Sequence, residues 1–346
     1  MAESVNQEIS DRLVEQQLKA ARVEAQQRRE VWAILALLQA DLVSAIAEND
    51  PTQFILLARR RREVEALVAE ELDPLITSRY EQIAKMIDDA MVRLAKHESQ
   101  AVEAIVNSTT QQEMIEAQPS ERALRVSVTQ SLFPSAATPT DLATVGADWW
   151  ARQGASLSQR LHDSLLVGVS LEENLLALLR RVRGSSAQAF ADGIVAKAKT
   201  DASRLLATQL TNTVGEARAA VAAANPIGLI VIHQSVLDSR TSSICLSRHG
   251  LKYTADTHDS IGHSIPYLSG VPYHPGCRSS IVPAVDDGGP IRQENVSQWL
   301  SRRDTAFQDE VLGPTRAALW RAGRLSIKNL IDAVSGKPLT LEEIGA

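Results

Sequence analysis

The residue types best suited to metal binding or nucleophilic chemistry are concentrated in one stretch of the chain, between His233 and Pro283. This stretch contains five of the seven histidines, both cysteines and three of the four tyrosines of the 346-residue chain. No glutamate occurs between Glu216 and Glu294, although the rest of the chain is rich in it. Prolines and glycines recur through the stretch, which indicates long loops between short elements. We therefore expect a separate small module here, presented by the rest of the chain.

Two pairs of potential metal ligands lie in this stretch. Cys245 and His249 are four residues apart, and His274 and Cys277 are three apart. A pair, a loop and a second pair is the general plan of a structural zinc site, and thiolate and imidazole ligands favour zinc over calcium or magnesium. The spacing therefore predicts a structural zinc ion. The alternative is that the cysteines are small buried hydrophobic residues and the histidines form hydrogen bonds in loops.

The same residues do not form a coherent catalytic set. A zinc peptidase with a His-Glu-x-x-His motif is excluded because the stretch contains no glutamate. A thiol nucleophile is a poor interpretation, because His274 lies only three residues from Cys277 and a base usually comes from a distant part of the fold. Asp238, Asp256 and Asp259 could complete a hydrolytic metal site with the histidines. We expect no enzyme, with a metal-dependent hydrolase as the alternative.

Composition bounds the class of protein. Hydrophobic residues at 44% and charged residues at 23% are typical of a soluble globular protein. A net charge of −6 argues against a general coat for nucleic acid. The longest uninterrupted apolar run, Val31–Leu38, is too short to cross a bilayer, and the first residues, MAESVNQEIS, lack the pattern of a secretory signal. We expect no membrane partner and synthesis in a reducing cytoplasm.

Outside the module, apolar residues recur at steps of three and four, which predicts long helices. Within it, three short runs predict strands: Gly228–Val236, Leu251–Thr254 and Ser279–Val285. The expected fold is mainly α with a small α+β module. The expected organisation is a helical arm or bundle (1–118), a linker (119–140), a second helical block (141–225), the module (226–290) and a C-terminal helical extension (291–346).

The densest basic run is Arg59, Arg60, Arg61 and Arg62. Its simplest interpretation is a solvated helix face answered by Glu63 and Glu65. A second hypothesis is a contact with DNA phosphates, shared with Arg180, Arg181 and Arg183. Four consecutive arginines spread around a helix cannot all face one ligand, which favours the first interpretation.

The chemistry-bearing residues also form a recognisable pattern: Leu237-Asp238-Ser239-Arg240-Thr241, then Cys245, Gly250 and Tyr253, and finally Pro272-Tyr273-His274-Pro275-Gly276-Cys277-Arg278. This pattern resembles the phage head morphogenesis domain, the family of the phage Mu F-like minor head proteins. The resemblance covers roughly residues 200–285. It departs from the family where Ser242 and Ser243 lie, since many members have a second cysteine there, and at His249, a position that is often acidic.

The resemblance implies a structural cluster of Cys245, His274 and Cys277, with the fourth ligand open among His249, Asp238 and His263. It implies structural roles for the remaining motif residues, which are Asp238, Arg240, Thr241, Gly250, Pro275 and Arg278. Either arginine could fork to Asp238 and hold a loop in place.

For function, the resemblance implies a minor protein of the phage head, assembled in the host cytoplasm and associated with the portal. Its expected partners are the portal, the major capsid or scaffold proteins and packaged DNA, with no small-molecule substrate. Because related domains are fused to toxins, a toxin-like enzyme on the same module is the alternative.

Overall fold

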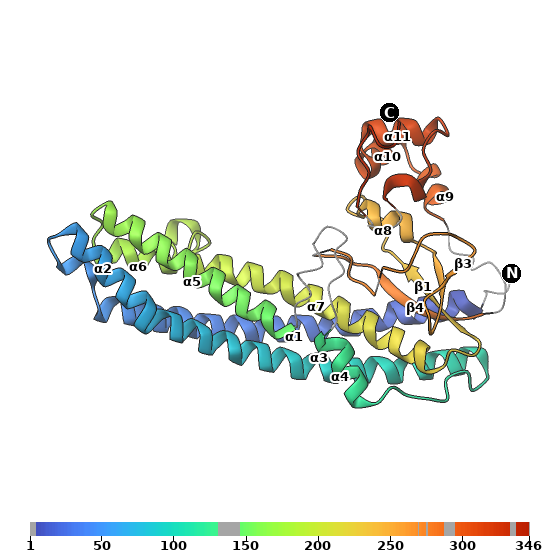
Figure 1. The fold of residues 1–346 in the computed structure, drawn as a ribbon, viewed down its shortest axis with the longest axis horizontal. Coiled ribbons are helices and arrows are strands. Elements are labelled where there is room, and N and C mark those ends of the chain that lie inside the picture. The colour runs from blue at the N-terminus through green and yellow to red at the C-terminus, as the bar shows by residue number, and fades with distance from the viewer. Residues whose placement is uncertain are drawn as a thin grey trace. The chain divides into compact units, whose positions relative to one another are not determined.

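The structure is a computed structural model that describes residues 5–130, 146–268, 270–274, 276–286, 295–332 and 337–345. It is mainly helical with one small antiparallel sheet, so the predicted fold class is confirmed (Figure 1). The helices are α1 (Val5–Glu48), α2 (Leu57–Leu67), α3 (Asp73–Thr110), α4 (Glu121–Gln130), α5 (Gly146–Ser170), α6 (Leu175–Arg183), α7 (Ile194–Ala224), α8 (Ser243–Arg248), α9 (Val296–Ser301), α10 (Thr305–Leu312) and α11 (Pro314–Arg321). The strands are β1 (Leu229–Gln234), β2 (Lys252–Thr254), β3 (Ser260–Ile261) and β4 (Ser280–Val285).

The chain forms two compact units, each assembled from separated segments. Unit 1 comprises Met1–Ala21, Met91–Thr144 and Thr208–Ala346, and unit 2 comprises Arg22–Ala90 and Val145–Ala207. Helices α1, α3 and α7 each contribute residues to both units. The units therefore do not follow consecutive stretches of sequence.

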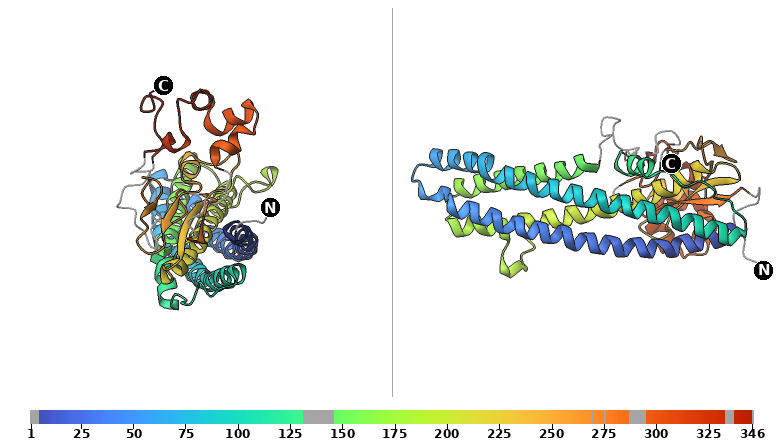
Figure 2. Two further views of the ribbon diagram at one scale, coloured as in Figure 1. Left: turned by 90° about the vertical axis from the view of Figure 1, so that its right-hand side faces the viewer. Right: turned by 90° about the horizontal axis from the view of Figure 1, so that it is seen from below.

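Unit 2 is a set of helices lying side by side, best seen from below (Figure 2, right). Its core is almost entirely aliphatic, because apolar residues at steps of three and four place a continuous buried stripe on each helix. Leu35 and Leu38 of α1, Ile83 of α3 and Leu161 of α5 are all fully buried. Gly154 packs closely on the ring of Tyr80, since a β-carbon at Gly154 would lie 3.2 Å from that ring.

Helix α1 also has a composition relevant to membranes. The helical stretch Val5–Gln53 contains an 18-residue window of mean hydropathy 1.6, with 39% of the window buried, so by length and composition it could cross a bilayer. One such helix near the N-terminus is weak evidence, because core helices of soluble proteins and signal sequences have the same composition. The absence of a membrane partner stays a prediction.

Unit 1 contains the sheet, whose strands lie in the order β3-β2-β1-β4 with every pairing antiparallel. The predicted strands are thus confirmed. Central strand β1 is buried along almost its whole length, and Val231 faces Tyr253 on one side and Pro283 on the other. Proline is tolerated at Pro283 because β4 is an edge strand of the described sheet.

The predicted linker, residues 119–140, is helical in part, because α4 occupies 121–130; residues 131–140 lie outside the described residues. The hydroxyl of Ser120 accepts a hydrogen bond from the backbone N–H of Ala123, as an N-cap does. Leu124 and Val128, one turn apart, are buried. A capped helix with only two buried apolar residues has too short a periodic signal to stand out in a Ser- and Pro-rich segment.

The C-terminal helices form a separate small core in unit 1. It joins Leu246 of α8 to the apolar faces of α9, α10 and α11, including Trp299 and Leu312. The capping box at the start of α9, formed by Asn295 and Gln298, fixes where that helix begins. This core anchors α8, the helix that carries Cys245, from one side.

Candidate metal centre

The loop between β1 and α8 is fixed by the Asp-Ser-Arg-Thr motif. The hydroxyl of Thr241 accepts a hydrogen bond from the backbone N–H of Asp238 (2.9 Å) and donates one to the carbonyl of Val236 (2.6 Å). The carboxylate of Asp238 accepts a bond from the backbone N–H of Arg240 (2.9 Å). Ser242 then caps α8 by accepting a bond from the N–H of Cys245. The motif thereby sets the position of Cys245 in the first turn of α8.

Arg278 joins this loop to the one that carries the second pair of ligands. Its guanidinium donates two hydrogen bonds to the two carboxylate oxygens of Asp238, each 2.6 Å long. These bonds hold the pKa of Asp238 well below its ordinary value. Such a bidentate pair is geometrically specific, so the expected fork to Asp238 is made by Arg278. Arg240 contributes its backbone N–H instead.

Cys245, His274 and Cys277 come together at the junction of the two loops. The Sγ atoms of the two cysteines are 3.6 Å apart, and Nε2 of His274 is 3.4 Å from Sγ of Cys245. One potential ligand atom from each of the three residues lies within 4.8 Å of the others. Both cysteines are buried and His274 is half-buried. Two sulfur donors and one imidazole at these separations could hold a metal ion that prefers soft ligands.

The contact between the two thiols moves their pKa values in opposite directions. The hydrogen bond from Cys245 lowers the pKa of Cys277, and the same contact, together with burial, raises the pKa of Cys245. Metal binding to a sulfur requires loss of the thiol proton, so the affinity for a metal rises with pH.

The three residues predicted as possible fourth ligands lie elsewhere. Nδ1 of His249 accepts a hydrogen bond from the backbone N–H of Ser235 (3.0 Å). His263 lies between the carbonyl of Lys252, 2.9 Å from Nε2, and the backbone N–H of Ile265. The carboxylate of Asp238 is committed to Arg278. Among the described residues, the structure brings three of the predicted ligands together and none of the three alternatives for the fourth.

The remaining motif residues have backbone roles or are not described. Gly250 has φ of +80°, a left-handed conformation that favours glycine, and its N–H donates to the carbonyl of His233 (2.8 Å). Pro275 lies outside the described residues.

The basic run on α2 is engaged within unit 2. Arg59 lies over the ring of Phe54 at 4.0 Å and pairs with Glu63 (3.5 Å), Arg60 donates to the carbonyl of Phe54, and Arg61 donates to Ser170. A DNA contact by Arg59–Arg62 stays a prediction.

The same module contains three buried polar side chains that the sequence pattern did not indicate. His233 and Arg248 are fully buried, and the hydroxyl of Tyr273 is buried near them. Among the described residues, both ring nitrogens of His233, two guanidinium nitrogens of Arg248 and the Tyr273 hydroxyl have no hydrogen-bond partner. Burial lowers the pKa of His233 to about 3, so the ring is neutral at physiological pH. The only signal in the sequence was the position of His233 at the end of a buried apolar strand.

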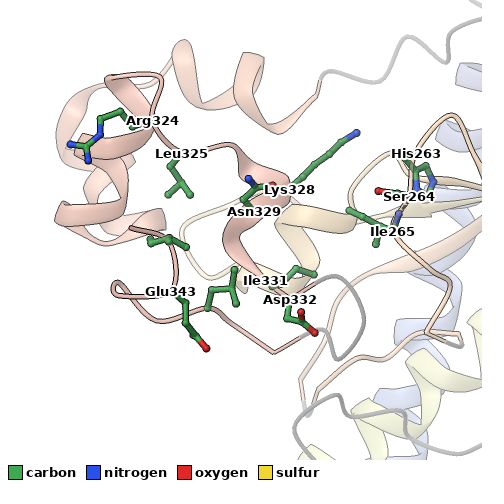
Figure 3. Close-up of a pocket in the computed structure, with 12 residues that line it drawn as sticks. His263, Ser264, Ile265, Arg324, Leu325, Lys328, Asn329, Ile331, Asp332 and Glu343 are labelled. Carbon is green, nitrogen blue, oxygen red and sulfur yellow. Dashed lines mark hydrogen bonds between the residues drawn. The ribbon is translucent and has the colours of Figure 1, made fainter. Parts of the chain in front are cut away.

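Two pockets border the module. A small one, of about 10 Å³, lies beside the cluster and is lined by Val236, Arg240, Thr241, Ser242, Cys245, His274, Gly276, Arg278 and Ser279. A larger one lies between the loop of His263 and the C-terminal segment around Lys328 and Glu343 (Figure 3). One of its two acidic residues, Glu343, accepts hydrogen bonds from the backbone and side chain of Thr340. The larger pocket is lined by none of Cys245, His274 and Cys277.

Comparison of the chain with protein-family models, with curated protein sequences and with solved structures finds no match. The resemblance to the phage head morphogenesis family therefore depends on the motif residues themselves.

Proposed function

We propose that this chain is a structural, non-enzymatic minor protein of a phage head that acts in head morphogenesis at the portal. The observation that supports the proposal most is that the motif residues form one cross-linked unit. Asp238 and Cys245 come from the first half of the motif, and His274, Cys277 and Arg278 from the second, about 30 residues later. They meet through the Asp238–Arg278 pair and the sulfur–imidazole cluster. A structural link between the two loops explains why these residue types occur together in the motif.

The metal in this proposal is zinc, held by Cys245, His274 and Cys277. Zinc would supply a rigid link between two loops that otherwise depend on hydrogen bonds and a small core. Structural zinc sites usually have four protein ligands, whereas catalytic sites have three. The three-donor set therefore favours one rival, a metal-dependent hydrolase built on the same module.

Replacing His274 and Cys277 separates the two functions. A structural site predicts loss of folding or of head assembly in Cys277→Ser and His274→Ala. A hydrolase predicts a folded protein that assembles normally and lacks an activity of the wild type. Circular dichroism and electron microscopy of heads assembled with each variant decide between them.

A portal-associated protein needs a docking surface, and unit 2 offers one at the end where α2 and α6 lie (Figure 1). The loop before α2 exposes Ile55 and Leu56, which are 95% and 71% accessible to solvent. Arg59 and Arg60 hold this loop through Phe54. Leu171 follows Ser170, the partner of Arg61, and is also exposed.

Large aliphatic side chains exposed together are typical of a surface that a partner protein covers. Arginines beside it suit a partner with carboxylates around an apolar groove. We assign this surface to the portal protein.

Co-purification tests the assignment. With the portal protein encoded alongside this chain, the double variant Ile55→Asp, Leu56→Asp should lose at least ~10-fold in affinity, as expected for removal of a central apolar anchor. The matched control is Ile227→Asp, since Ile227 is 90% exposed but lies in unit 1, next to β1. Equal binding by both variants would remove the docking surface, and no binding by the wild type would remove the portal as partner.

A further inference from the structure

The three-donor cluster leaves one coordination position of a tetrahedral metal unassigned. The predicted candidates for the fourth ligand form hydrogen bonds outside the cluster. These groups are the imidazoles of His249 and His263 and the carboxylate of Asp238. No other histidine, cysteine or acidic residue of the described chain joins the cluster. Since no described residue fills it, the fourth position is available to a ligand from outside the described chain. This inference rests on the proposal that the cluster binds a metal.

The small pocket shows where such a ligand would enter. It is bordered by Cys245 and His274, two of the three donors, and by the hydroxyls of Thr241 and Ser242. Its volume of about 10 Å³ is close to that of one water-sized sphere, so only the end of a small group fits. The Ser242 hydroxyl lies 2.9 Å from Nε2 of His274. A metal bound at Nε2 would take the place of that contact and release the hydroxyl as a hydrogen-bond donor.

The charge around the pocket selects the kind of ligand. Arg278 lines it, but Asp238 neutralises that guanidinium. Arg240 also lines it, and its exposed guanidinium has no ion pair or hydrogen bond to any described residue. Arg240 is thus the one described residue of the Asp-Ser-Arg-Thr motif whose charged side chain has no structural task. An unneutralised guanidinium beside a metal position favours an anion with oxygen atoms.

We propose that the fourth metal position takes the carboxylate group of a partner protein, from an aspartate, a glutamate or a C-terminus, which Arg240 also binds. A phosphate group, such as that of DNA, is the alternative outcome of the test below. The metal centre then acts as a recognition site as well as a link between loops.

Cobalt(II) in place of zinc makes the fourth position visible, because its absorption bands report both thiolate ligation and coordination geometry. The full-length protein loaded with one equivalent of cobalt(II) is titrated separately with sodium acetate and with inorganic phosphate. We expect a saturable change in the cobalt bands. In Arg240→Gln the anion should bind about tenfold more weakly or worse, as for loss of a charge-assisted hydrogen bond. The thiolate band should be unchanged in that variant, which shows that the cluster still forms.

Arg122→Gln serves as the matched control, because Arg122 is exposed on α4 and does not line the pocket. A response to acetate supports the carboxylate ligand, and a response to phosphate alone overturns it in favour of a phosphate group. A thiolate band with no response to either anion, or an equal response in Arg240→Gln, overturns the inference while leaving the metal in place. Absence of any thiolate band overturns the metal proposal itself.

Discussion

Among the described residues of unit 1, two arginines are completely buried, and they are held in opposite ways. Arg218 of α7 donates to Glu98 of α3, to the hydroxyl of Ser280 in β4 and to the carbonyl of Leu13 in α1. Arg248 of α8 donates to the carbonyl of Pro266 and the hydroxyl of Tyr253, but no described carboxylate faces it, and its Nε and Nη2 have no partner. One buried cation is thus paired with a buried carboxylate and the other is not.

The difference between Arg218 and Arg248 distinguishes a stabilising contact from the region around α8. Arg218 ties three helices to the sheet, so its bonds serve stability. Arg248 shares its helix with Cys245 and lies among His233 and Tyr273, whose polar atoms also lack partners. Most buried polar groups in proteins are satisfied, and violations concentrate at functional sites. The contrast therefore points to the region of α8 as the functional part of unit 1.

Replacing Arg218 should have the largest effect on the free energy of unfolding. Arg218→Met leaves Glu98 buried without its partner, which costs about 3–5 kcal/mol of the free energy of unfolding. Urea denaturation followed by circular dichroism measures it. Arg122→Met, at an exposed position, should change the same quantity by less than about 0.5 kcal/mol. A loss below about 1 kcal/mol in Arg218→Met would contradict the role assigned to this residue.

The metal should account for the next largest effect. Zinc at a hundred times its dissociation constant is expected to raise the free energy of unfolding by about 2.7 kcal/mol. The increment should vanish in Cys277→Ser and persist in His249→Ala, because the structure places His249 outside the cluster. Thermal denaturation with zinc and with a chelator gives the increment for each variant. An equal increment in the wild type and Cys277→Ser would exclude this cluster as the site.

Burial of His233 should make the free energy of unfolding decrease as the pH falls. His233 is neutral when folded down to a pKa of about 3, whereas the unfolded chain takes up that proton near pH 6.5. The unfolded state then binds more protons as pH falls, so stability decreases below pH 6.5, by about 2 kcal/mol at pH 5. His233→Leu should abolish this share of the pH dependence. Chemical denaturation of both proteins at pH 7 and pH 5 isolates it, and parallel losses in the two would refute the assignment.

The smallest effect is expected at the surface link between the loops. Asp238→Asn weakens the two bonds from Arg278 at a pair whose side chains are more than one-third exposed. The expected loss is about 1–2 kcal/mol, less than for the buried pair because solvent screens the charges. Since the pKa of Asp238 is depressed when folded, its contribution is present above the ordinary aspartate pKa and is lost as pH falls below it. Denaturation at pH 7 and pH 3 tests both statements.

Local sequence patterns predicted much of the fold and of the candidate metal site. Apolar steps of three and four predicted the long helices, and the β-branched run around Val231 predicted the central strand, because both periods follow from backbone geometry. The spacing of Cys245, His274 and Cys277 predicted three donors of one cluster. The fork to Asp238 was predicted too, although which arginine makes it was left open.

The sequence alone determined the helical fold class, three of the four described strands and the residues able to bind a soft metal, since each depends on residue type and short-range spacing. Only the tertiary structure decided that His249 faces Ser235, that Arg218 meets Glu98, and that α1, α3 and α7 divide their residues between two units. Those facts depend on which surfaces pack together across a hundred or more residues, or on the direction of a single side chain at a helix end. Neither is encoded in a local period, because the same stripe or the same imidazole can serve several partners until packing selects one.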